Sequence, residues 1–312
     1  MDNQDIPFLT TVELSELIRT REVSPVEATS AYLDRIEALN FKFNSYLTVC
    51  RTEAMAAAEE AEQAIARGDY LGPMHGIPVA VKDQIWTKGI RTTVGSRLMA
   101  DFIPDEDATA IANLKRAGAV LLGKTNLTEF ALGGSQRYGL NRNPWNLDRF
   151  TGGSSGGSGS ATSAFLCSTS LGEDTGGSIR RPAAWCGIVG LRPSWGRVSR
   201  YGVAPGSWSM DQVGPISRTV EDAAITLGAI AGHDPRDPYS WDTPVPNYRH
   251  ALGGDLSGVR VGAIRELIES EIVDPEVRNG IRAAAAVLEE LGATVEDVSL
   301  PLTVHGGTWP PR

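Results

Sequence analysis

The apolar positions of the first 70 residues recur at helical spacing. Residues 24–27 read Ser-Pro-Val-Glu, which places a capping serine, a proline at the first helical position and a glutamate at the third. An apolar stripe follows this start and consists of Ala28, Tyr32, Ile36 and Leu39. Thr10 and Glu13 form a similar start for 12–18, and 54–66 is an Ala- and Glu-rich stretch that stops at Gly68. The pattern predicts three helices.

Short apolar runs replace this helical pattern from residue 76 onward. We predict strands at 76–82, 119–122, 167–171, 259–264 and 294–298, and helices at 107–117, 219–230 and 274–291. Helices that alternate with short buried strands are typical of an α/β fold with a largely parallel or mixed sheet.

One segment breaks the alternation, because 151–160 reads TGGSSGGSGS. Its composition is that of a flexible linker. However, it runs directly into the apolar stretch 161–171 and then into a second small-residue turn at 174–178. We therefore favour a buried glycine-rich loop, in which backbone lies close to backbone or to a substrate. The linker is kept as the alternative.

Charge and composition exclude several classes of protein. The net charge of −9 argues against a nucleic-acid partner. No apolar run is long enough to span a bilayer, and no signal peptide is visible at the start. An odd number of dispersed cysteines indicates a reducing compartment, so we expect a cytoplasmic protein without a membrane partner. The cysteines are Cys50, Cys167 and Cys186.

The histidines bear on metal binding. None of the four lies at the spacing of a zinc-binding pair, so we expect no metal and no other cofactor. They are His75, His233, His250 and His305.

Two motif matches have simpler structural explanations. Residues 118–125 fit the phosphate-binding pattern G-x-x-x-x-G-K-[ST], but the intervening residues are apolar and predict a strand whose end carries Lys124 and Thr125. Residues 152–156 fit the nucleophile elbow G-x-S-x-G. The stretch before them is no obvious strand, and no histidine is marked as the base, so we favour neither motif.

A lysine and a serine loop are better candidates for chemistry. Lys82 follows the most apolar strand, where burial lowers a lysine pKa and can give a neutral base. The alternative is an ion pair with the adjacent Asp83. Ser178 follows two glycines, and the N–H groups of 175–178 form a nest that suits an oxyanion. The alternative is that Ser178 caps a helix.

Four blocks of sequence together resemble the amidase signature family. They read GIPVAVKD at 76–83, GKTNLTEF at 123–130, GGSSGGS at 152–158 and DTGGSIR at 174–180. They occur in the family's order and spacing, and the resemblance covers nearly the whole chain. It implies an α/β fold with a central mixed sheet that has helices on both faces. It also implies a single domain over 1–312, with a helical part at 1–70, a catalytic core at 71–235 and a partial C-terminal part at 236–312.

The resemblance also implies a Ser–cis-Ser–Lys mechanism. Ser178 is then the acyl nucleophile, and Ser154, after a cis peptide bond, relays a proton between Ser178 and the neutral base Lys82. The implied oxyanion hole consists of the N–H groups of Thr175, Gly176, Gly177 and Ser178. The implied supporting residues are Ser155, Arg180 and Asp174. Pocket residues are expected partly from 132–139 and 201–210.

This chain departs from the family pattern in two ways. Glu173 stands where the family usually has Thr or Ser, and an extra buried charge there shifts the pKa of Lys82. Family chains also usually continue well past the residues that end this one, 308–312. We therefore expect a C-terminally truncated chain.

The leading hypothesis is an amidase, a hydrolase of non-peptide C–N bonds. It would convert a small linear amide to an acid plus ammonia or an amine through an acyl-enzyme on Ser178. An alternative is the glutaminase (A) subunit of a tRNA-dependent amidotransferase, although 131–137 does not resemble that subunit's usual segment. A further alternative is a truncated, inactive homologue. The expected partner is the small-molecule amide, and a homodimer is left open.

Overall fold

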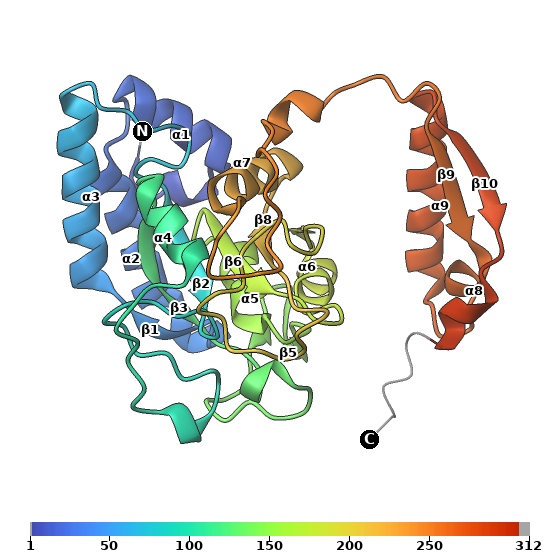
Figure 1. The fold of residues 1–312 in the computed structure, drawn as a ribbon, viewed down its shortest axis with the longest axis horizontal. Helices are drawn as coiled ribbons and strands as arrows, with labels where there is room; N and C mark the ends of the chain where they lie inside the picture. Colours follow the sequence, from blue (N-terminus) through green and yellow to red (C-terminus); the bar gives the residue numbers. More distant parts are fainter. Residues whose placement is uncertain (1, 306–312) are drawn as a thin grey trace. The chain divides into compact units, whose positions relative to one another are not determined.

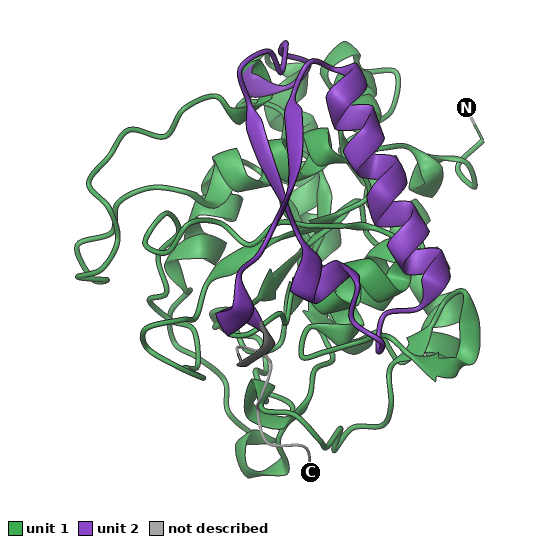
Figure 2. Cartoon of the chain, turned by 90° about the vertical axis from the view of Figure 1, so that its right-hand side faces the viewer, with its two compact units in different colours: residues 1–250 green, residues 251–312 purple. Residues whose placement is uncertain are grey.

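The computed structural model describes residues 2–305, without the side chains of Val304 and His305. The chain forms two compact units, Met1–His250 and Ala251–Arg312, which Figure 2 colours separately. The predicted single domain, with boundaries at 70 and 235, stays a prediction. The segment 308–312, on which the expected truncation rests, lies outside the described residues.

Four helical elements open the first unit. They are η1 (Ile6–Phe8), α1 (Thr11–Thr20), α2 (Pro25–Phe43) and α3 (Arg51–Ala66). Both predicted helix starts are confirmed as reciprocal capping boxes, in which Thr10 pairs with Glu13 and Ser24 pairs with Glu27. The predicted stripe from Ala28 to Ile36 is buried against the rest of the unit.

A six-stranded sheet lies at the centre of this unit (Figure 1). In spatial order its strands are β1 (Tyr46–Val49), β3 (Val120–Thr125), β2 (Pro78–Lys82), β6 (Thr169–Glu173), β8 (Val213–Ser217) and β7 (Val189–Gly190). The pairs β2–β3 and β2–β6 are parallel, and the other three pairs are antiparallel. The sheet is therefore mixed, as predicted.

Helices cover both faces of this sheet. Successive side chains of a strand point to opposite faces. On β6, Ser170 contacts Thr162 of α5 (Gly156–Ser163), whereas its neighbour Thr169 contacts Thr226 of α7 (Val220–Ile230). The two helices thus lie on opposite sides of β6. The predicted α/β fold class is confirmed.

The remaining elements of the first unit are short. They are η2 (Arg97–Met99), α4 (Thr109–Arg116), η3 (Glu129–Ala131), α6 (Arg180–Cys186) and a hairpin of β4 (Arg142–Asn143) with β5 (Asn146–Phe150). The short helix η4 (Tyr248–Ala251) ends at the first residue of the second unit. In the second unit, β9 (Arg260–Ile264) and β10 (Thr294–Val298) are parallel, with α8 (Arg265–Ile268), α9 (Pro275–Glu290) and η5 (Pro301–His305). No helix within residues 2–305 has the length and apolar character needed to cross a bilayer.

The glycine-rich segment is part of the core. The linker alternative is wrong, because α5 begins at Gly156 and its first seven residues are all buried. A Cβ atom on Gly157 would lie 2.4 Å from the main-chain nitrogen of Asn126 and 2.5 Å from the carbonyl oxygen of Ser45. Backbone therefore packs directly against backbone here, which only glycine permits.

Candidate active site

Lys82 is the last residue of β2, and its side chain is completely buried. Its Nζ atom lies 2.8 Å from Ser154 Oγ, 3.1 Å from the carbonyl oxygen of Glu173 and 3.1 Å from Glu173 Oε2. The alternative in which Asp83 is the partner of Lys82 is wrong. Asp83 instead faces Lys124, with 3.5 Å between Oδ1 and Nζ.

The Asp83–Lys124 pair lies at the neighbouring strand ends. Thr93 donates to Asp83 Oδ2 from its main-chain nitrogen at 2.7 Å and from its hydroxyl at 2.6 Å. Lys124 is buried in β3 and donates to the carbonyl oxygen of Ile85 at 2.6 Å. Burial lowers the pKa of Lys124 to about 8, although Asp83 opposes this shift. Because 120–125 is a strand, as predicted, the phosphate-loop match has no loop to bind phosphate.

The loop before α5 brings Ser154 to Lys82. The peptide bond between Gly153 and Ser154 is cis, as the family resemblance implies. The neighbouring Ser155 donates from its main-chain nitrogen to the carbonyl oxygen of Ser178 at 3.2 Å. Its hydroxyl donates to the carbonyl oxygen of Glu173 at 3.1 Å. Ser155 therefore connects the loops of Ser154 and Ser178 and the end of β6.

Asp174 organises the loop that carries Ser178. Its carboxylate accepts from the main-chain nitrogens of Gly177 at 2.6 Å and Ile179 at 3.0 Å, and from the Arg180 guanidinium at 3.0 and 3.1 Å. Burial alone raises the pKa of Asp174, but these hydrogen bonds outweigh burial and lower it to about 2. The Asp174 carboxylate therefore connects the start of the loop to Gly177, Ile179 and Arg180 on either side of Ser178.

Ser178 lies in this loop and is 4% exposed. The helix-cap alternative for Ser178 is wrong, because α6 begins at Arg180 and Ile179 occupies its capping position. The N–H group of Gly177 already donates to Asp174 in this structure. An oxyanion hole at 175–178 stays a prediction.

The two serine hydroxyls have different surroundings. Ser154 Oγ contacts Lys82, and its main-chain oxygen accepts from Thr128 at 3.3 Å. Within residues 2–305, no hydrogen bond joins the hydroxyls of Ser154 and Ser178. The structure thus brings Lys82, Ser154 and the Ser178 loop into one cluster, and the catalytic roles of these residues stay predictions.

Sequence reasoning did not place Asp211 in this cluster. The Thr175 hydroxyl lies 3.0 Å from Glu173 Oε1 and 2.6 Å from Asp211 Oδ1. Asp211 also accepts from the main-chain nitrogens of Gly206 at 2.7 Å and Ser207 at 2.8 Å. The segment after 205 therefore meets the Ser178 loop. The pattern DQVGP at 211–215 carries no signal of this role by itself.

The described histidine side chains do not support the nucleophile-elbow interpretation of 152–156, because each of them has a partner elsewhere. His75 contacts Leu71, His233 contacts Ser240 and His250 contacts Asn247. A strand does precede the glycine loop, contrary to expectation, but β5 is an exposed hairpin strand outside the six-stranded sheet.

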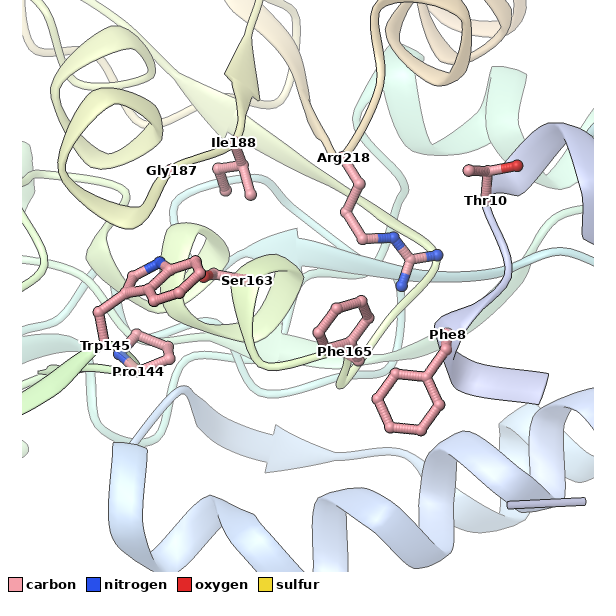
Figure 3. Close-up of a pocket in the computed structure, with 9 residues that line it drawn as sticks. All are labelled: Phe8, Thr10, Pro144, Trp145, Ser163, Phe165, Gly187, Ile188 and Arg218. Atoms are coloured by element: carbon pink, nitrogen blue, oxygen red, sulfur yellow. The ribbon is translucent and has the colours of Figure 1, made fainter. Parts of the chain in front are cut away.

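The structure shows a cavity away from this cluster. It measures about 460 Å³, and Figure 3 shows the Arg218 guanidinium beside the Phe165 ring at one side and Trp145 at the other. Arg218 lies 5.0 Å from the centre of the Phe165 ring and donates to the carbonyl oxygen of Pro7 at 2.6 Å. The lining of this cavity includes none of Lys82, Ser154 and Ser178.

Within residues 2–305, no group of three acidic, histidine or cysteine side chains is arranged to hold a metal ion.

Comparisons with known proteins agree with this geometry. The Amidase family model matches residues 27–306. The A subunit of glutamyl-tRNA(Gln) amidotransferase from Moorella thermoacetica is 49% identical over 304 residues, which is 96% of this chain and 62% of that protein. Its counterpart from Geobacter metallireducens is 51% identical over 298 residues, which is 95% of this chain and 61% of that protein.

Among solved structures, peptide amidase from Stenotrophomonas maltophilia matches with a TM-score of 0.87 and 36% identity. The match covers 95% of this chain and 63% of that one. The chain thus spans about three fifths of the length of the curated relatives it matches. On the family match and these identities, the chain belongs to the amidase family.

Proposed function

We propose that this chain carries the catalytic groups of a serine amide hydrolase, with Ser178 as nucleophile, Ser154 as proton relay and Lys82 as base. The observation that carries the proposal is the buried contact of 2.8 Å between Lys82 Nζ and Ser154 Oγ. A serine hydroxyl attacks only when a base takes its proton, and a buried lysine can be that base.

The proposed reaction proceeds in two steps. Ser178 Oγ attacks the amide carbonyl carbon, its proton passes to Ser154, and Ser154 passes its own proton to Lys82. The C–N bond then breaks, the relay returns a proton to the leaving nitrogen, and ammonia or an amine departs. Water attacks the acyl-enzyme in the same manner and releases the acid. Free N–H groups of the loop at 175–178 would stabilise the developing oxyanion.

A fluorophosphonate probe tests the nucleophile without knowledge of the substrate. We expect covalent labelling of the chain, and loss of labelling in Ser178→Ala. Ser30→Ala on α2, outside the cluster, is the matched control and keeps full labelling. Folded protein that shows no labelling dependent on Ser178 contradicts the proposal and favours the inactive homologue.

The names of the relatives favour one substrate class. Both relatives at 49–51% identity are called the A subunit of glutamyl-tRNA(Gln) amidotransferase. We therefore propose that the amide is the side-chain carboxamide of glutamine and that the ammonia passes to a partner protein. The names of these relatives favour the amidotransferase alternative over a stand-alone amidase. By contrast, residues 131–137 do not resemble the usual segment of the amidotransferase A subunit.

A substrate comparison separates these two candidates. Ammonia release is measured with glutamine, asparagine, acetamide and benzamide, and amine release with an anilide. Preference for glutamine, together with stoichiometric capture of a partner encoded beside this chain, supports the amidotransferase component. Turnover of acetamide or the anilide without any partner supports the stand-alone amidase.

A further inference from the structure

Glu173 contacts the proposed base directly. It is the last residue of β6, and its side chain is completely buried. Its Oε2 atom lies 3.1 Å from Lys82 Nζ, and its Oε1 atom accepts from the Thr175 hydroxyl at 3.0 Å. The resemblance to the amidase signature family leads us to expect Thr or Ser at this position, so the Glu173 carboxylate is a departure from that expectation.

We propose that Glu173 is a positioning residue that holds Lys82 as an ammonium, so that acylation of Ser178 needs a more alkaline solution than a neutral residue 173 would require. This inference rests on the proposed function, because it concerns the protonation of the proposed base.

The geometry around the nitrogen supports this role. An ammonium group has three N–H donors, and Lys82 Nζ has three oxygens within hydrogen-bond distance. Two of these oxygens belong to Glu173. A neutral Lys82 amine would instead accept a hydrogen bond from the Ser154 hydroxyl, and the Glu173 carboxylate would then be buried without a positive partner. The carboxylate therefore favours the charged form of Lys82, which cannot accept the proton from Ser154.

Other charged groups near Lys82 have partners of their own. Asp174 pairs with Arg180 and Arg192, and Asp211 accepts from main-chain nitrogens and from Thr175. Asp83 pairs with Lys124.

Burial dominates both pKa values, and the contribution of each partner to the other acts against burial. Burial lowers the pKa of Lys82, and Glu173 is the strongest group that opposes the shift, ahead of Asp174 and Asp211. Burial raises the pKa of Glu173, and Lys82 is the strongest group that lowers it. In a variant without the Glu173 charge, the nearest carboxylate no longer raises the pKa of Lys82, and burial therefore lowers this pKa further.

The rate of fluorophosphonate labelling as a function of pH tests the inference. In this reaction Ser178 Oγ forms a bond to phosphorus, the P–F bond breaks, and fluoride leaves. The Ser178 proton passes to Ser154, whose own proton passes to Lys82. The labelling rate therefore rises with pH as Lys82 becomes neutral.

In Glu173→Gln we expect the midpoint of this rise to fall by about one to three pH units. Labelling at pH 7 accelerates by about tenfold for each unit of the shift. Glu59→Gln, an exposed substitution of the same kind on α3, keeps the profile of the unaltered chain. Glu173→Thr, which places a neutral hydroxyl at this position, shifts the profile in the same direction and serves if the glutamine variant does not fold.

The contrary outcomes are distinct. An unchanged midpoint in a folded, labelled Glu173 variant overturns the inference, and a rise in the midpoint identifies Glu173 as a proton acceptor instead. A labelling plateau already reached below pH 7 in the unaltered chain overturns it without any variant. By contrast, absence of Ser178-dependent labelling at every pH in the unaltered chain contradicts the proposed function itself, and the inference fails with it.

Discussion

The carboxylate of Asp83 and the ammonium group of Lys124 face each other at 3.5 Å, and both side chains are excluded from solvent. Asp83 directly follows Lys82 in sequence, and Lys124 lies in β3, which pairs with β2. The pairing leaves Lys82 to contact Ser154 and Glu173. Lys124 thus provides the counter-charge for Asp83, which is the neighbour in sequence of the proposed base Lys82.

We expect Lys124→Met to lower the free energy of unfolding by about 3–5 kcal/mol, because it leaves Asp83 buried without a counter-charge. The double variant Lys124→Met with Asp83→Asn should recover much of this loss, since a neutral amide oxygen can still accept from Thr93. Urea unfolding measures both. A double variant as unstable as the single one contradicts the buried ion pair as the cause.

Substitution of the relay or the base should impair acylation without unfolding the chain. We expect Ser154→Ala and Lys82→Ala to slow the labelling of Ser178 by roughly 10²–10⁴-fold, the usual effect of losing a general base. Circular dichroism of each variant checks that the fold is intact. His233→Ala is the control and should retain full activity; if it were inactive and Lys82→Ala active, the histidine-based elbow would be the better interpretation.

The close backbone packing at α5 predicts a strong effect of one methyl group. A Cβ at position 157 meets main-chain atoms of Asn126 and Ser45, which cannot move aside as a flexible side chain can. We expect Gly157→Ala to lower the free energy of unfolding by about 3 kcal/mol, the upper end for overpacking.

Gly228→Ala is the matched control for that substitution. It also places alanine inside a helix, α7, but apart from the adjacent residues and the backbone of that helix no described atom lies within 4 Å of the added Cβ. It should be neutral or stabilise the protein by about 0.5–1 kcal/mol. Equal effects of the two substitutions in thermal or urea unfolding would show that packing at α5 is not the cause.

Acid should destabilise the loop that holds Ser178. The pKa of Asp174 is about 2 in the folded chain and near its ordinary value of 3.8 when unfolded, so its contribution is complete above pH 3.8 and is lost as the pH falls through 2. The contribution is on the order of 2 kcal/mol. The unfolding free energy of Asp174→Asn should therefore depend less on pH between 5 and 2 than that of the unaltered chain. Parallel pH dependences of the two proteins would contradict this role.

The sequence predicted elements whose signals are local. Capping at Thr10 and Ser24 depends on residues within one helical turn, and both helix starts are confirmed. Strand β10 matches its predicted bounds, Thr294–Val298. By contrast, α5 reads GGSGSATS, and such a sequence has weak helix propensity. It is helical because surrounding backbone buries it, which no local pattern reveals.

The candidate site shows the same division. The family blocks pointed to Lys82, Ser154 and Ser178 as candidates, and the structure brings their loops together. The partner of Lys82 was not predictable from neighbouring residues, because Glu173 reaches it across the pairing of β2 with β6 rather than along the chain. Likewise Asp211 is 36 positions from Thr175, and tertiary folding alone brings their side chains together.

A main-chain hydrogen bond from Ser155 to Ser178 joins the two serine loops, and it involves neither the Ser154 hydroxyl nor the Ser178 hydroxyl. Removal of the Ser178 hydroxyl therefore takes away one oxygen atom and leaves the framework in place. A Ser178→Ala protein is thus suited to act as a receptor for intact amides. Equilibrium dialysis with that protein would rank amides by affinity alone, free of turnover.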